Sequence, residues 1–350
     1  MSPKLPSRKA NPASTSPGFD KELAELEVLS EAVKSGTAPT TDQVEHLRKT
    51  LAHRNNFLVS KAAKLVAEAE LTALLPDVLA AYDRFFIDPG TTDPKCWAKE
   101  ALAKALVKLG HRTKDAYLRG MRHHQMEASW GPPVDTAGAL RGTCTHALVD
   151  CPGISDAELL TALLEPLTDI DKTVRMEAAR AIGNVGGVSA ALLMRLRAML
   201  GPAMHDDDEP EVLGAVYSAL LSLEGTSAIP LVAQALEAGD DTAAEAAFAL
   251  ADMRSTASLA ALISCLKDGA DTWFTGVLLS AIALTRLPEA LDYLLATIAR
   301  DAREAPAAIE AIGRSAPNAE LRAQVEQAVE KADSSRLRQA FCQHLPAIPE

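Results

Sequence analysis

A short helical pattern recurs along the chain. It consists of a small residue, an aliphatic residue, two variable residues, a second aliphatic residue, and then glycine or proline. The best-formed copy is Ala181, Ile182, Val185 and Gly186, within residues 171–187. Neighbouring copies start between 28 residues (Ala283 to Ala311) and 42 residues (Ala105 to Ala147) apart, a period typical of helical repeat proteins. The copies start at Leu65, Ala105, Ala147, Ala181, Ala219, Ala249, Ala283, Ala311 and Ala340.

A second helical run precedes most copies, so each unit is expected to be a helix, a turn and a helix. One such unit alone would leave an apolar face in water, and stacking of neighbouring units buries that face. We therefore predict an all-α, right-handed α-solenoid (α-α superhelix) of about eight helix pairs. The second runs are expected at residues 71–85, 156–167, 190–200, 227–236, 256–266 and 289–298.

The segment around residues 169–187 resembles a known repeat family. Its pattern is similar to the second helix of a HEAT repeat, including the bacterial HEAT-like repeats of phycobilin lyase relatives (the PBS-lyase type). That resemblance implies a solenoid whose second helices line a concave surface, and no particular chemistry. Asp171 is expected to cap this helix, with Arg175, Glu177 and Arg180 on its polar side. The matching positions are Asp169, Val174, Arg175, Ala178, Ala179, Ala181, Ile182, Gly183 and Gly186.

Composition and charge divide the chain into five parts. We expect a disordered, basic, Pro/Ser-rich tail (1–19), an N-terminal helix (20–39), irregular repeats with long loops (40–152), regular repeats (153–345) and a short tail (346–350). Residues 1–150 contain 20 basic and 18 acidic residues, a net charge of +2, whereas residues 151–350 contain 15 and 29, a net charge of −14. The two halves are therefore expected to differ in electrostatic potential.

Several functional classes are disfavoured. The net charge of −12 argues against general nucleic-acid binding, which depends on clustered Lys and Arg. No signal peptide or membrane span is evident, and five scattered cysteines without a CxxC pair suggest reduced thiols, so we expect a cytoplasmic protein. No nucleophile, phosphate-loop or metal-ligand motif is present, so we expect no catalytic residue, cofactor or metal site. The acidic run at residues 205–209 is interpreted as a polar loop between repeats.

The least repeat-like region lies between residues 95 and 141. Residues 95–122 contain eight basic and two acidic side chains, a net charge of +6, and a long loop with Trp130 near its tip follows. Arg and Trp are favoured anchors in protein interfaces, so we predict a partner-binding surface here. The alternative is a solvated helix face beside a loop whose tryptophan fills a gap between repeats. The candidate residues are Lys104, Lys108, Arg112, Arg119, Arg122, His123, His124, Trp130 and Arg141.

We therefore expect a non-enzymatic scaffold or adaptor that binds another protein through its concave surface and the basic, Trp-bearing region 95–141. The partner is expected to present an acidic segment to the basic region, or a basic segment to the acidic C-terminal repeats. Two alternatives remain: a sensor of an anion or small ligand housed between repeats, and an accessory or catalytic HEAT-like protein, such as a chromophore-lyase subunit or a DNA-repair glycosylase. The glycosylase alternative would use Trp97, Trp130, Asp135 and Arg141. Trp97 and Trp273 are otherwise expected to pack between repeats, and Asp135 or Thr136 to cap the following helix.

Overall fold

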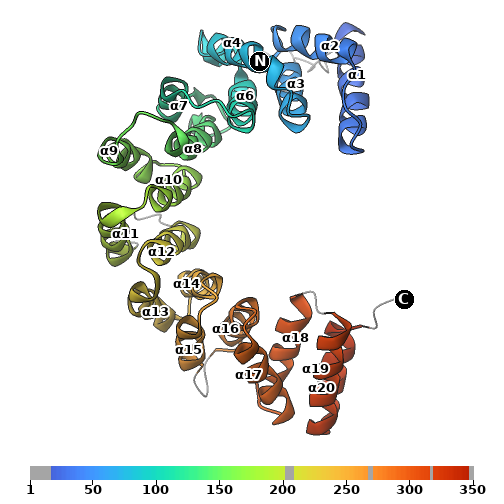
Figure 1. The fold of residues 1–350 in the computed structure, drawn as a ribbon, viewed down its shortest axis with the longest axis vertical. Coiled ribbons are helices and arrows are strands. Elements are labelled where there is room, and N and C mark those ends of the chain that lie inside the picture. The colour runs from blue at the N-terminus through green and yellow to red at the C-terminus, as the bar shows by residue number, and fades with distance from the viewer. Residues whose placement is uncertain (1–16, 202–208, 267–270, 316–317, 347–350) are drawn as a thin grey trace, which may run out of the picture. The chain divides into compact units, whose positions relative to one another are not determined.

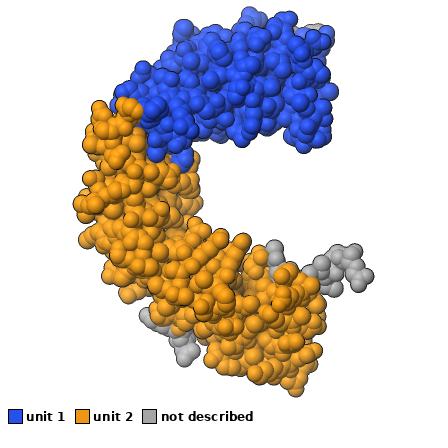
Figure 2. Space-filling view, viewed as in Figure 1, with its two compact units in different colours: residues 1–152 blue, residues 153–350 orange. Residues whose placement is uncertain are grey.

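The computed structural model describes residues 17–201, 209–266, 271–315 and 318–346, and these are almost entirely helical. The chain is all-α, as predicted, with one exception among the described residues: a small antiparallel hairpin of two-residue strands. It forms two compact units, residues 1–152 and 153–350 (Figure 2).

The first unit contains eight described α-helices and the hairpin. Helix α1 starts at Pro17, three residues earlier than expected, and residues 1–16 of the predicted tail lie outside the described part. The α-helices are α1 (Pro17–Lys34), α2 (Thr41–Leu51), α3 (Asn56–Glu68), α4 (Leu75–Arg84), α5 (Pro89–Thr92), α6 (Trp97–Lys108), α7 (Lys114–Met121) and α8 (Gly138–Ala147). Short 3-10 turns occupy Thr72–Leu74, Pro94–Cys96 and Leu148–Asp150, and the strands are β1 (Met126–Glu127) and β2 (Val134–Asp135).

The second unit is a succession of antiparallel helix pairs (Figure 1). Each even-numbered helix from α10 to α18 packs against the next even-numbered helix, and the odd-numbered helices pack beside them. The α-helices are α9 (Asp156–Leu167), α10 (Lys172–Val185), α11 (Gly187–Leu200), α12 (Pro210–Glu224), α13 (Ile229–Ala235), α14 (Asp241–Asp252), α15 (Thr256–Cys265), α16 (Thr272–Leu284), α17 (Pro288–Ala299), α18 (Ala305–Arg314), α19 (Ala319–Ala332) and α20 (Ser335–His344).

The recurring pattern forms the core between even-numbered helices. The small residue lets helices approach closely and the aliphatic residue fills the contact. The glycine in Ala-Ile-Gly has the same role: a Cβ at Gly183 would lie 3.0 Å from the Ala219 Cβ on α12. A Cβ at Gly313 would lie 2.5 Å from the His344 carbonyl oxygen on α20. The buried pairs include Ala105 and Leu106, Ala147 and Leu148, Ala181 and Ile182, Ala219 and Leu220, Ala249 and Leu250, and Ala311 and Ile312.

One copy of the pattern has a different register in the structure. Helix α16 buries Ala281 and Ile282, and leaves Leu284 43% exposed. The residues Ala283 and Leu284 therefore match the spacing of the repeat in the sequence, but they do not lie on the face of α16 that packs against the neighbouring helices. Leu284 lies in the last turn of α16, where it faces solvent.

The caps of α10 are those expected, but one of its side chains is not where the pattern placed it. The Asp171 side chain accepts a hydrogen bond from the Thr173 N–H, and Gly186 ends the helix with a φ of 79°. Arg175 was expected on the polar side, yet it is buried. Its Nη1 donates to the Asp169 carbonyl at 2.8 Å and the Ile170 carbonyl at 3.0 Å. Arg175 thus connects α10 to the chain that follows α9.

Within the part of the chain that the structure describes, one segment is long and apolar enough to cross a membrane: residues Pro210–Ala238, which include α12 and α13. In the structure, 61% of its apolar window is buried. Gly225 has a φ of 60° and separates α12 from α13, so the segment is not one straight helix. These features are those of a core segment in a folded helical unit.

Candidate functional site

The region between α7 and α8 was predicted to be a loop with Trp130 near its tip, and it forms the hairpin. Met126 pairs with Asp135, and Glu127 pairs with Val134. At the tip, the Ser129 hydroxyl donates to the Pro132 carbonyl at 2.6 Å and accepts from the Gly131 N–H at 3.1 Å. Trp130 lies in this turn and is fully exposed.

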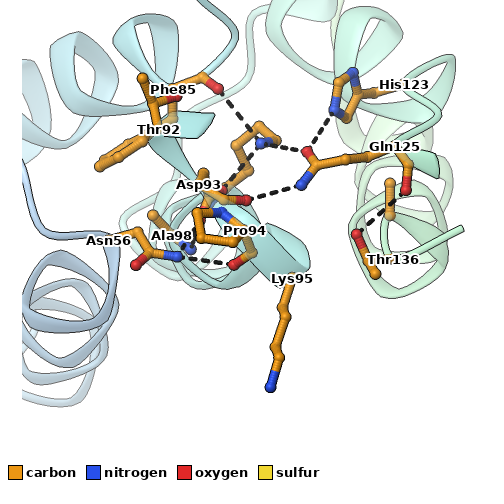
Figure 3. A network of polar contacts seen from close by, with 12 residues as sticks. Asn56, Phe85, Thr92, Asp93, Pro94, Lys95, Ala98, His123, Gln125 and Thr136 are labelled. Atoms are coloured by element: carbon orange, nitrogen blue, oxygen red, sulfur yellow. Dashed lines mark hydrogen bonds and ion pairs between the residues drawn. The ribbon is translucent and has the colours of Figure 1, made fainter. Parts of the chain in front are cut away.

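A buried polar network fixes the base of the hairpin (Figure 3). The Lys99 Nζ lies 3.0 Å from the Asp93 Oδ2, 2.9 Å from the Gln125 Oε1 and 3.3 Å from the Phe85 carbonyl oxygen. The Gln125 Nε2 donates to the Asp93 carbonyl at 2.8 Å. Gln125, the last residue before β1, is thereby joined to α6 and to the end of α4.

Asp93 is the centre of this network and has no exposed side-chain surface. Its carboxylate accepts from the backbone N–H groups of Ala98 and Lys99 in the first turn of α6, at 2.9 and 3.0 Å. It also accepts from the Asn56 side chain at 2.9 Å. A carboxylate at a helix N-terminus is favoured by both the free N–H groups and the helix dipole. Each strong acceptor site of Asp93 is therefore used within the fold.

The backbone leading into α6 is strained. Asp88, Lys95 and Cys96 all have positive φ angles, of 50°, 64° and 56°. Such conformations cost about 1–3 kcal/mol each in residues other than glycine, and persist where the surrounding contacts determine them. Here the Lys95 N–H donates to the Glu127 carboxylate on β1 at 2.6 Å. The strained segment and the hairpin therefore hold each other in place.

Asp135 anchors the other strand. It accepts from Arg141 at 2.7 Å, from His124 at 2.8 Å, and from the backbone N–H groups of Gln125 and Ala137 at 3.0 Å each. Burial alone would raise the pKa of Asp135, but the N–H groups of Ala137 and Gln125, followed by His124 and Arg141, lower the pKa to about 2. Asp135 lies in β2 and does not cap α8, whose N-cap is Ala137.

Arg141 was predicted to lie on the partner-binding surface, and the structure contradicts this. It is only 1% exposed, and besides Asp135 it donates to the His123 carbonyl at 3.1 Å. A side chain at this depth has no surface with which to contact a partner. Arg141 and Asp135 are therefore structural groups at the base of the hairpin, which also removes them from the glycosylase-like set of residues.

The basic side chains of the predicted surface mostly have acidic partners. Lys104 pairs with Glu100 at 2.7 Å, and Lys108 pairs with Glu70 at 2.8 Å. Arg119 pairs with Asp83 and lies over the Phe86 ring, 4.4 Å from its centroid. Three carboxylates from other segments, Asp93, Glu70 and Asp83, therefore offset half of the excess of +6 counted along the sequence. Surface pairs of this kind contribute little to stability.

The remaining predicted residues lie at both ends of α7. His123 is half-buried against Phe86 and bonds to Gln125 at 3.2 Å, and burial, the largest effect, lowers its pKa. His124 is exposed and bonds to Asp135. Arg122 is exposed beside them, and Arg112 is exposed at the other end of the helix. Of the nine predicted residues, Arg141 is buried, and the others come from α6, from α7 and the residues that flank it, and from the tip of the hairpin.

An exposed apolar set lies on and beside the hairpin, and we call it the hairpin surface: Trp97, Met126, Trp130 and Val134. Trp97 contacts Phe57 at a ring distance of 5.7 Å, as expected for packing between helices, yet it remains 41% exposed. Lys95 Nζ lies 4.9 Å from the Trp97 ring. The sequence analysis missed Met126 and Val134. The only sequence signal for them is the alternation of an apolar and an acidic residue in each strand. Met126 lies opposite Asp135 and Val134 lies opposite Glu127, so each face of the hairpin carries one apolar and one acidic side chain.

Two observations concern the possible metal ligands and thiols. In the described part of the chain, no three His, Cys, Asp or Glu side chains are grouped as metal ligands. Burial, the largest effect, raises the pKa of both the Cys96 and the Cys144 thiols to about 12, which disfavours the nucleophilic thiolate. Most of the acidic run at residues 205–209 lies outside the described residues.

Comparisons with known proteins do not assign the site. No protein-family model matches the chain, and no curated protein resembles it closely enough to count as a match.

Proposed function

We propose that the chain is a non-enzymatic scaffold of HEAT-like repeats, a right-handed α-solenoid, and that its hairpin surface binds another protein. The packing of each even-numbered helix of the second unit on the next supports the repeat architecture. None of the five cysteines forms a disulfide, which favours the cytoplasmic location that we also propose.

The observation that supports binding most directly is the difference in exposure between Trp130 at the tip of the hairpin and the buried polar network at the base of the hairpin. Trp130 is fully exposed, whereas Asp93, Lys99 and Gln125 beneath the hairpin are buried and hydrogen-bonded. Exposing a tryptophan forgoes the burial of its large apolar surface, and tryptophan is enriched among the dominant residues of protein interfaces. A rigid support lowers the conformational entropy lost on binding.

The partner that fits this surface has an apolar patch beside an acidic segment. Trp130 supplies the main apolar contact, with Met126 on one face of the hairpin and Val134 on the other. The exposed residues Lys95 and His124 lie in the segments that lead into α6 and into β1. Electrostatic complementarity of this kind affects the association rate and the choice of partner more than affinity. Lys95→Glu should therefore slow association with an acidic partner and make the remaining binding less dependent on salt, because an attractive charge pair that salt would screen has been removed.

Capture from an extract of the native host tests the proposal. Full-length protein is immobilised, and bound proteins are quantified by mass spectrometry for wild type, Trp130→Ser and Met126→Ser. We expect at least one protein to be depleted tenfold or more with both variants. Val188→Ser, at an exposed apolar residue of α11, is the matched control and should capture as wild type does. Identical captured sets for all four proteins would contradict the proposal, provided circular dichroism shows equal helicity.

A further inference from the structure

The second unit has a groove along its even-numbered helices, separate from the hairpin surface. Two cavities of about 580 and 560 Å³ adjoin each other there. The first is lined by α10, α12, α14 and the end of α16, and the second by α14, α16 and α18. Phe248 and Leu284 line both cavities, so the two are parts of one continuous groove, which we call the even-helix groove.

The middle of the even-helix groove is apolar and exposed. Phe248, Trp273 and Leu284 are 38%, 49% and 43% exposed. Trp273 stands in the first turn of α16, where Asp271 caps the helix, and was expected to pack between repeats. Leu284 is exposed because the face of α16 that packs into the core carries Ala281 and Ile282. An exposed group of large apolar side chains in a cavity is a common feature of peptide-binding sites.

Two arginines at the groove have equivalent positions in successive repeats. Arg254 follows the end of α14 by two residues, and Arg286 follows the end of α16 by two residues. Both have a left-handed backbone, with φ of 48° and 56°, and both are exposed. Neither makes an ion pair or a side-chain hydrogen bond with any residue that the structure describes, although this half of the chain has a net charge of −14. The other arginines lining the groove, Arg180 and Arg314, pair with Glu177 and Glu310.

The acidic residues of the groove differ in availability. Glu211 is held by Lys172 at 3.3 Å. Glu245 packs over Gly214 and is half-buried, and burial, followed by the charge of Glu211, raises its pKa. Asp252 is exposed two residues before Arg254. The end of the groove with Arg254 and Arg286 is therefore its cationic end, since two unpaired cations face one exposed carboxylate there.

We propose that the even-helix groove binds an extended segment of another protein in which a large apolar side chain stands next to one or two carboxylates. The apolar side chain occupies the space between Phe248, Trp273 and Leu284. The carboxylates pair with Arg254 and Arg286. Guanidinium groups bind carboxylates through paired hydrogen bonds, which fixes the direction of the segment as well as its charge. This proposal is independent of the one for the hairpin surface.

Selection from a random library of 12-residue peptides tests the proposal. The library is displayed on phage and selected on the immobilised full-length chain, and selected peptides are synthesised and measured by fluorescence anisotropy. We expect them to contain an aromatic residue or leucine within four positions of Asp or Glu. Arg254→Glu with Arg286→Glu should weaken binding at least tenfold, as should Phe248→Ser. Peptides with Asp or Glu replaced by Lys should bind the double variant better than the wild type.

Two controls separate the groove from other surfaces. Arg300→Glu changes an exposed arginine at the end of α17, outside the groove, and should leave affinity unchanged. Trp130→Ser should also leave it unchanged. No enrichment, enrichment of basic peptides only, or equal affinity for the arginine double variant would overturn the proposal. The wild type could also self-associate in a way that Arg254→Glu with Arg286→Glu abolishes. That result would show that the groove binds a second copy of this chain, and it would also overturn the proposal.

Discussion

Asp93 and Lys99 form an ion pair, with 3.0 Å between Oδ2 and Nζ, in which neither side chain reaches solvent. Removing two charges from water is costly, and their attraction offsets the cost only where other hydrogen bonds complete the site. Here two backbone N–H groups, Asn56, Gln125 and the Phe85 carbonyl supply them. The pair therefore determines geometry, since it positions Gln125 and the hairpin that begins after it.

Removing only the cation of this ion pair should strongly destabilise the fold. Lys99→Met leaves the Asp93 carboxylate buried without its cation, and we expect a loss of about 3–5 kcal/mol in the free energy of unfolding. Urea unfolding followed by circular dichroism measures it. The double variant Asp93→Asn with Lys99→Met removes both charges, and its free energy of unfolding should fall by less than that of Lys99→Met alone. Equal stability of Lys99→Met and wild type would show that the pair is not buried in solution.

The low pKa of Asp135 predicts an acid-dependent contribution to stability. Its pKa of about 2 in the folded protein lies below the ordinary value of 3.8. The ionised carboxylate therefore stabilises the fold fully above about pH 4, and this contribution is lost as pH falls towards 2. Asp135→Asn should be less stable than wild type at pH 7, and the difference should narrow between pH 4 and pH 2.

An exposed aspartate supplies the control for the substitution itself. Asp115 in α7 is exposed, and Asp115→Asn should change the free energy of unfolding at pH 7 by no more than about 0.5 kcal/mol. A constant difference between Asp135→Asn and wild type over the acid range would contradict the assigned role.

The same substitution at two helical glycines should have opposite effects. A Cβ at Gly120 in α7 would lie 2.3 Å from the Tyr82 hydroxyl and 2.4 Å from the Cys144 sulfur, both buried, so Gly120→Ala should cost about 1–3 kcal/mol. A Cβ at Gly276 in α16 would meet nothing within 4 Å, so Gly276→Ala should stabilise by about 0.5–1 kcal/mol. Thermal unfolding measures both, and a gain from Gly120→Ala would exclude the close packing at α7.

The register of α16 predicts which of two neighbouring aliphatic residues matters for stability. Ile282 is buried, so Ile282→Ala should cost about 2–5 kcal/mol. Leu284 is largely exposed, so Leu284→Ala should change stability by no more than about 0.5 kcal/mol. Denaturant unfolding of the two variants compares them directly. A larger loss of stability from Leu284→Ala than from Ile282→Ala would show that Leu284 faces the core, as the repeat spacing predicted.

Most helices could be predicted from the sequence because their information is local. Helix α9 spans Asp156–Leu167, the predicted run, and the Ala181-Ile182 pattern falls on the buried side of α10. Caps such as Asp171 act on residues two positions away. Arg175 and Leu284 were misplaced because a helical repeat predicts a face, whereas burial depends on how the neighbouring helix lies against that face.

The candidate site was predicted only in part. The exposed loop around Trp130 was expected from its length and prolines, but Arg141 was counted with the surface cations and is buried. Counting charges along residues 95–122 also overstated the basic surface. Lys108 is neutralised by Glu70, and Arg119 by Asp83, residues 38 and 36 positions away in the chain. Carboxylates so distant in sequence come close only after folding.

By itself, the sequence determined an all-α chain of recurring helices with an irregular, tryptophan-containing region in its N-terminal half. Helical periodicity, caps and glycine stops are properties of neighbouring residues, which explains why they could be recognised without a structure. Only the tertiary structure decided which charges are paired, which tryptophans face solvent, and that Asp93, Lys99 and Gln125 support a hairpin. The energy of a charge or an aromatic ring depends on burial and on its partners, and both are set by contacts between distant segments.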